Sequence, residues 1–451
     1  MTTPAPPATA APPPPRAATP PAAAAPVAPA QPRAATGRLA ALTASVRASL
    51  AGTPGRLRAL GVLGVVAALL FGLAAGQAFR SADGALGRAA ANSDQVVRIQ
   101  AIQTNVVQAD ADATNAFLVG GLEPAAQRAA YTSAIASASR LIAEAAQHQP
   151  ADGAALGALN ESLVAYTSEV EQARANNRQA LPVGAQYLKN ASATLRSEAL
   201  PLLKNLGEAN DARVAEEFDR AGRAALWLVI PGLLALAVLA LVLVWLARRT
   251  RRYVNLPLAA GALVVLVTLV LGAVGLAGVR GDVDTTRDGA YAATVSTARA
   301  RIAGFDAKSN ESLTLIARGS GAAFEKAWQA SAAVVTAEIS ELGTNPASSG
   351  LAPLPWSDYA LMHEDIRSLD DSGNWEAAVE KATGDGAGNT TFAAFDASSD
   401  EQLATLGDQT SRQLDQSGGW LPAAGALGIL AGVVAAVCAW WGVSQRLEEY
   451  R

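Results

Sequence analysis

The chain has little of what most chemical centres are built from, with one cysteine and two histidines in 451 residues. The cysteine, Cys438, lies inside a long apolar run, so the polar parts of the chain can form neither a disulfide nor a cysteine-ligated metal site. His148 and His363 stand far apart, and no further histidine accompanies His363 at the spacing of a zinc motif. The sequence therefore predicts no catalytic residues and no metal site.

Two polar runs have the composition of a ligand loop without its spacing. Asp370–Asn374 is similar to a calcium loop in composition only, and we interpret it as a turn between helices. Gly384–Asn389 is rich in glycine, but no strand precedes it and no Lys-Ser or Lys-Thr pair follows, as a phosphate loop requires. We therefore expect no enzyme and no cofactor.

Long apolar segments are what the chain does have. About 20 apolar residues cross a bilayer as a helix, so each of these segments predicts a transmembrane helix. Apart from Arg58 near one end, none contains a charged residue, which argues against an ion or proton transporter. The four segments are Leu57–Phe79, Ala224–Ala247, Leu256–Val279 and Trp420–Val443.

The distribution of charge predicts how these helices are oriented. The loop between the second and third segments, residues 248–255, begins with Arg248, Arg249, Arg251 and Arg252. Arginine beside a membrane helix marks the cytoplasmic side and contacts anionic lipid, which explains this cluster without nucleic acid. Both termini are then cytoplasmic in a multi-pass protein of the plasma membrane. Residues 81–223 and 280–418 form two extracytoplasmic domains.

The first extracytoplasmic domain, 81–223, reads as an antiparallel four-helix bundle. Apolar residues recur at steps of three and four along Ile99–Ala116 and again along Leu156–Ala173, as a helix seam requires. Glycine and proline break the pattern at Gly120, Pro150 and Pro182. Three breaks give four helices, of which the first continues from one membrane helix and the last leads into the next.

The second domain, 280–418, is acidic and has a similar layout. Gly319 follows its membrane segment at nearly the distance at which Gly120 follows the first, and Asp306 occupies a place similar to that of Asp110. Tyr131 and Trp328 correspond in the same way. The fold class predicted is an all-α membrane protein with four transmembrane helices, two extracytoplasmic helical bundles and an internal duplication.

The predicted cytoplasmic parts are small. Residues 1–36 form a Pro/Ala-rich tail with too few large apolar side chains to fold, and 37–56 combine a short amphipathic helix with a linker. The loop 248–255 and the tail 444–451 complete this side. None is long enough for a kinase or cyclase, so we expect output to pass through a bound partner.

One polar stretch in the first domain predicts a binding site. Arginine beside paired asparagines suits a carboxylate ligand or a protein partner, and a solvated helix face capped by a turn is the alternative. The residues are Glu171, Arg174, Asn176, Asn177 and Arg178.

The layout resembles the GlnX-like family of actinobacterial four-span membrane proteins. The stretch Glu171–Leu188 and the pattern Trp356, Tyr359, Asp365–Arg367, Asp370–Asp371, Trp375 are most similar to that family. The resemblance implies a relay in which a solute-binding lipoprotein senses aspartate or glutamate outside and soluble protein kinase G responds inside. It assigns no contact residue.

Two further functions stay open at this point. The bundle of a chemoreceptor-like sensor would bind a small ligand directly, and a structural scaffold would hold an envelope complex together. A homo-oligomer is compatible with the relay, the direct sensor and the scaffold.

Overall fold

The computed structural model describes residues 53–119, 123–250 and 255–448. Within these ranges every regular element is a helix, so the all-helical prediction is confirmed. The predicted tail 1–36, most of the segment 37–56, the break at Gly120, and Arg251 and Arg252 lie outside the described residues. From Leu57 onward the chain forms one unit, and the contacts below lie within it.

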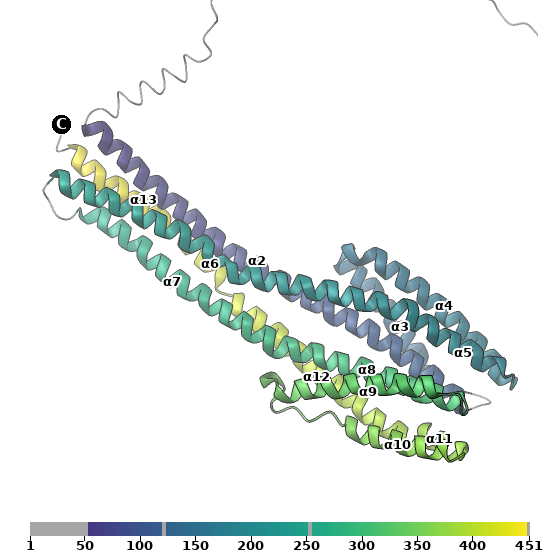
Figure 1. Cartoon of the computed structure of the whole chain (residues 1–451). Helices are drawn as coiled ribbons and strands as arrows, with labels where there is room; N and C mark the ends of the chain where they lie inside the picture. The colour runs from purple at the N-terminus through teal and green to yellow at the C-terminus, as the bar shows by residue number, and fades with distance from the viewer. Residues whose placement is uncertain (1–52, 120–122, 251–254, 449–451) are drawn as a thin grey trace, which may run out of the picture. The chain divides into compact units, whose positions relative to one another are not determined.

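The first half is built on two very long helices that pass from an apolar segment into a bundle (Figure 1). The outgoing helix is α2, and the returning one is a continuous run of α5, a π-helical turn η2, and α6. Two shorter helices and a 3₁₀ turn lie between them. The bounds are α2 Thr53–Val119, α3 Ala125–His148, η1 Pro150–Asp152, α4 Gly153–Arg178, α5 Val183–Thr194, η2 Leu195–Ala199 and α6 Leu200–Thr250.

The second half starts with another continuous run, in which α7 passes through the π-helical turn η3 into α8. Shorter helices follow, and α13 carries the last apolar segment. The bounds are α7 Leu256–Thr286, η3 Arg287–Tyr291, α8 Ala292–Ile316, α9 Ala322–Thr344, η4 Pro346–Ser348, α10 Trp356–Asp371, α11 Trp375–Ala382, α12 Ala387–Gly418 and α13 Leu421–Glu448.

The glycine-rich run Gly384–Asn389 connects α11 to α12 only in its first part, because α12 begins at Ala387. Gly386 precedes the helix, and its carbonyl accepts the first helical bond from the Thr390 amide at 3.0 Å. A Cβ on Gly386 would lie 2.3 Å from the Glu380 carbonyl oxygen, so the tight approach to α11 requires glycine.

Each bundle has its own apolar core. In the first, the predicted seam residues Ile99, Leu159 and Tyr166 are buried among small side chains of the neighbouring helices. In the second, aromatic rings fill the centre: Trp356 packs against Phe395 at 5.2 Å between ring centroids, and Tyr359 packs against Phe392 at 5.1 Å. The similar layout of the halves therefore does not extend to the composition of their cores, and internal duplication stays a prediction.

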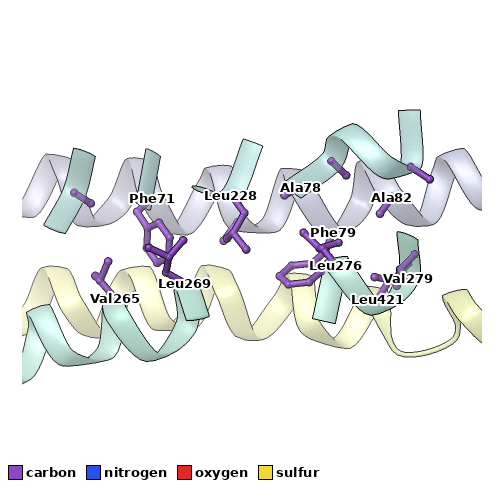
Figure 2. Packing of buried hydrophobic residues seen from close by; sticks show 14 of the residues in the cluster. Phe71, Ala78, Phe79, Ala82, Leu228, Val265, Leu269, Leu276, Val279 and Leu421 are labelled. Carbon is purple, nitrogen blue, oxygen red and sulfur yellow. The ribbon is translucent and has the colours of Figure 1, made fainter. Parts of the chain in front are cut away.

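Within the part of the chain that the structure describes, four helices are long and apolar enough to cross a membrane. Their apolar segments pack in a row of buried side chains that includes Phe71, Phe79, Leu228 and Leu276 (Figure 2). Outward-facing leucines on the same helices are largely exposed, Leu234 by 66% and Leu271 by 68%. So much exposed apolar surface suits lipid rather than water, which is consistent with a multi-pass membrane protein.

Glycines let α2 and α13 approach each other closely. Gly72 and Gly76 on α2 face Gly428 and Gly432 on α13, and both pairs have the small-xxx-small spacing of closely packed membrane helices. A Cβ on Gly432 would lie 2.4 Å from the Gly72 Cα. The backbones therefore meet with no room for a side chain.

We expect Gly432→Ala to destabilise the protein by about 1–3 kcal/mol, because neither backbone can move away without unpacking the helix pair. The matched control is Gly278→Ala on α7, where a Cβ would meet nothing within 4 Å. The control should be neutral or stabilising, since alanine favours a helix over glycine. Thermal unfolding of both variants in detergent measures the difference, and equal melting temperatures would contradict the close approach.

Candidate functional site

The five residues predicted to bind lie on the last two turns of α4. The structure places three of them, Arg174, Asn177 and Arg178, around one cavity. Glu123, two residues before α3, and Arg128, in the first turn of α3, line it as well, while Glu171 and Asn176 do not. Charged groups that the sequence separates by about fifty positions therefore share one end of the first bundle. Binding by these residues stays a prediction.

The cavity is small and has an apolar floor. Its volume is about 50 Å³, and Ala113, Phe117, Val170 and Leu188 form much of its wall. Small-molecule sites typically enclose about 300–1,000 Å³. The space suits an inserted carboxylate group better than a whole amino acid.

Arg174 is the most constrained residue of the five. Its Nη2 donates to Glu123 Oε1 at 2.9 Å and its Nη1 to Glu171 Oε1 at 2.6 Å. The guanidinium also lies 4.1 Å from the centroid of the Tyr131 ring. Burial lowers the pKa of Arg174, but Glu171 and Glu123 outweigh this and raise it. Arg174 thus fixes the end of α4 to the start of α3.

The asparagines also have partners, whereas two arginines beside the cavity have none among the described residues. Asn177 Nδ2 donates to the Phe117 carbonyl on α2 at 3.4 Å, and Asn176 Nδ2 donates within α4 to Gln172 at 2.8 Å. Arg178 and Arg128 are exposed, and neither guanidinium has a hydrogen bond or ion pair among the described residues. These two cations are available to a partner at the mouth of the cavity.

The arginines predicted to set the topology lie at the end of α6. Arg248 and Arg249 occupy its last turn and are exposed. Arg251 and Arg252 lie outside the described residues. A topological or output role for this cluster stays a prediction.

Sequence analysis missed a charged junction between the two bundles. Arg196, in the π-helical turn η2, reaches Asp110 on α2 through Nη1 at 3.2 Å and Asp306 on α8 through Nη2 at 3.0 Å. Two serines complete it: Ser192 Oγ and Ser309 Oγ each donate to Asp110 at 2.6 Å. We call these five residues the Arg196 junction. The matching places of Asp110 and Asp306 in the two halves were the only sequence signal for it.

The second π-helical turn makes a similar contact nearer the membrane helices. Tyr291, the last residue of η3, donates its hydroxyl to Asp211 on α6 at 2.6 Å. Burial raises the pKa of the Tyr291 hydroxyl, and Asp211 raises it further. π-Helical turns are often found at functional sites. Here both of them carry side chains that join one half of the chain to the other.

A buried ionic cluster holds the second bundle together. Lys308 Nζ lies 2.7 Å from Glu311 Oε1, and the other oxygen of Glu311 lies 2.8 Å from His363 Nδ1. His363 Nε2 faces Glu325 at 3.3 Å, and its ring stacks on Trp328 with centroids 3.6 Å apart. Burial lowers the pKa of His363, but the two carboxylates raise it above its ordinary value. Burial by itself would raise the pKa of Glu311. Lys308 and His363 outweigh this effect and lower the pKa to about 2.

Comparison with known proteins identifies part of the chain. No curated protein and no solved structure matches it. Residues 85–219, however, match the family model of an actinobacterial sensor domain. The match begins within α2 and ends within α6, so it covers the first bundle, including Arg174 and Arg196. This part of the chain is thus similar to an actinobacterial sensor domain, which supports a role in sensing or signalling.

Proposed function

We propose that this chain is a membrane signal transducer whose first bundle senses conditions outside the cell. One observation carries the proposal: the sensor-domain match lies on a bundle whose first and last helices, α2 and α6, are the helices that run through apolar segments. A shift of either helix in the bundle would reach the far end of the same helix without crossing a loop. Such a change requires that the stimulus bind one arrangement of the bundle more tightly than another.

In the finer form of this proposal the stimulus is a protein rather than a free solute. A solute-binding lipoprotein, loaded according to the supply of aspartate or glutamate, would place an acidic side chain in the Arg174 cavity beside Arg178. The volume of about 50 Å³ and the two free arginines at its mouth support an inserted carboxylate. On the cytoplasmic side, a soluble protein kinase would meet the face that contains Arg248 and Arg249.

The test is to purify the tagged full-length protein from native membranes in mild detergent, with and without added aspartate and glutamate. We expect a solute-binding lipoprotein and a soluble kinase to co-purify. Arg178→Glu should reduce recovery of the lipoprotein about tenfold or more, because like charges facing each other at an interface cost several kcal/mol. Recovery of the kinase should persist.

The matched control is Arg412→Glu on α12, an exposed arginine outside this cavity. It should leave both partners bound. If neither partner is recovered while other membrane complexes survive the same detergent, the relay is wrong. Calorimetric binding of glutamate by the purified chain alone would then favour a direct sensor, and ligand-independent recovery of envelope proteins would favour a scaffold.

A further inference from the structure

A second cavity lies between the two halves of the chain. Its volume is about 370 Å³, which is within the range of small-molecule sites. Residues of α2 form one wall, and residues of η3, α8 and α12 form the others. Every charged side chain that lines it is a carboxylate: Asp94, Asp400 and Asp408.

Two of these carboxylates, both exposed, form no ion pair among the described residues. Asp400 pairs with Arg301, but Asp94 and Asp408 have no ion pair or hydrogen bond among the described residues. Arg98, one turn along α2 from Asp94, donates instead to Gln95 at 2.7 Å. Partial burial raises the pKa of Asp94 and Asp415 adds to this, while Arg98 and His148 lower it. Neither of these cations lines the cavity, so the charged groups on its wall are all negative.

A buried serine in the lining supplies an independent sign of a polar site. Ser93 lines the cavity, is only 4% exposed, and its Oγ has no hydrogen-bond partner. An unsatisfied buried hydroxyl costs about 1–3 kcal/mol, so it calls for an explanation. Thr294 and Thr410 also line the cavity and donate to their own helices at 2.8 and 2.9 Å. Their hydroxyl oxygens lie 3.4 Å apart, and each can still accept a hydrogen bond from a donor.

The remaining wall is apolar, formed by Val97, Leu403 and Leu414. A carboxylate rim, hydroxyl acceptors and an aliphatic wall together match an alkyl chain that ends in an ammonium group. A metal ion fits less well, because no group of three or more metal-ligating side chains converges among the described residues. We propose that this cavity binds a small alkylammonium ion, with its nitrogen between Asp94, Asp408 and Ser93.

Such a ligand would bridge the halves, since Asp94 belongs to α2 and Asp408 to α12. Its binding would favour the arrangement in which the two bundles are packed together. The site is separate from the Arg174 cavity, so this inference does not depend on the relay proposed above.

Isothermal titration of the purified full-length protein in detergent with n-butylammonium and putrescine tests the proposal. We expect saturable binding of the amines that weakens as salt is added, and none of the uncharged analogue n-butanol. Equal binding of n-butanol, binding of Mg²⁺ or Ca²⁺ in place of the amines, or no binding at all would overturn it.

Variants locate the site. Asp94→Asn and Asp408→Asn should each weaken amine binding about tenfold or more, as expected for hydrogen bonds to charged groups. Glu401→Gln, an exposed residue of α12 that does not line the cavity, is the matched control and should bind like the unaltered protein.

Ser93→Ala separates a ligand role from a structural one. Because its Oγ has no partner in the protein, alanine should leave the melting temperature of the ligand-free protein unchanged or raise it, and yet weaken amine binding severalfold. A lower melting temperature together with unchanged binding would assign Ser93 to the core and remove it from the site.

Discussion

Lys308→Met is expected to lower the free energy of unfolding of the second bundle by about 3 kcal/mol or more, because it leaves Glu311 charged and buried without its main partner. Glu311 is 0% exposed and Lys308 is 2% exposed, so water cannot replace the lost ammonium group. Lys308 also donates to the Ala382 carbonyl at 3.0 Å, and this bond would be lost as well. Glu311 would then keep only His363 as a cationic partner among the described residues.

Hydrogen exchange of α8 and α10 measures this effect locally, and circular dichroism follows thermal unfolding of the whole chain. The matched control is Lys326→Met on α9, an exposed lysine without an ion pair among the described residues, which should change stability by less than about 0.5 kcal/mol. The double change Lys308→Met, Glu311→Leu should recover part of the loss, since removing both charges removes the unpaired one. If Lys308→Met proved as mild as the control, the cluster would not be the stable ion pair described here.

The parts of this structure that could be predicted from sequence are those governed by local periodicity. Long apolar runs require helices that cross lipid, because only a helix satisfies its own backbone there. The helical period places residues three and four positions apart on one face, so the buried face of Leu156, Leu159 and Leu163 can be recognised from their spacing. The turn between α10 and α11 could also be predicted, because the run Asp370–Asn374 is polar and contains a glycine. In the structure Gly373 adopts a φ of 82°, a conformation that favours glycine.

The contacts that join the bundles could not be predicted in this way. Arg196 meets Asp306 from 110 positions away, and nothing local distinguishes it from any other arginine on a polar helix face. The direction of the Arg196 side chain depends on the π-helical turn η2, and residues 195–199 have no sequence pattern that predicts such a turn. His363 is similar: the sequence shows a polar His-Glu-Asp run, and only the fold places Glu311 and Trp328 on either side of the imidazole.

Arg196→Met is expected to separate the two bundles more than it unfolds either one. Asp110 is 1% exposed and would keep Ser192 and Ser309 as donors but lose its cation, at a cost of about 2–3 kcal/mol. Asp306 would keep Asn310 and Ser331. Burial lowers the pKa of Arg196, but Asp110 and Asp306 outweigh it, which shows how strongly the two carboxylates together stabilise the cation.

A double-mutant cycle of Arg196→Met with Asp306→Asn isolates the contact between the bundles from the contact inside the first one. We expect a coupling energy of about 1 kcal/mol or more for this pair, because substitutions within one hydrogen-bonded network have non-additive effects on the free energy of unfolding. Arg140→Met, which removes only an exposed pair with Glu144 on α3, is the matched control and should cost less than about 1 kcal/mol. In hydrogen exchange, Arg196→Met should loosen the facing surfaces of α2 and α8 while α4 stays protected. Uniform loosening of the first bundle would instead make Arg196 an ordinary part of its core, and α2 would then be joined to α8 through the Asp110–Ser309 hydrogen bond rather than through Arg196.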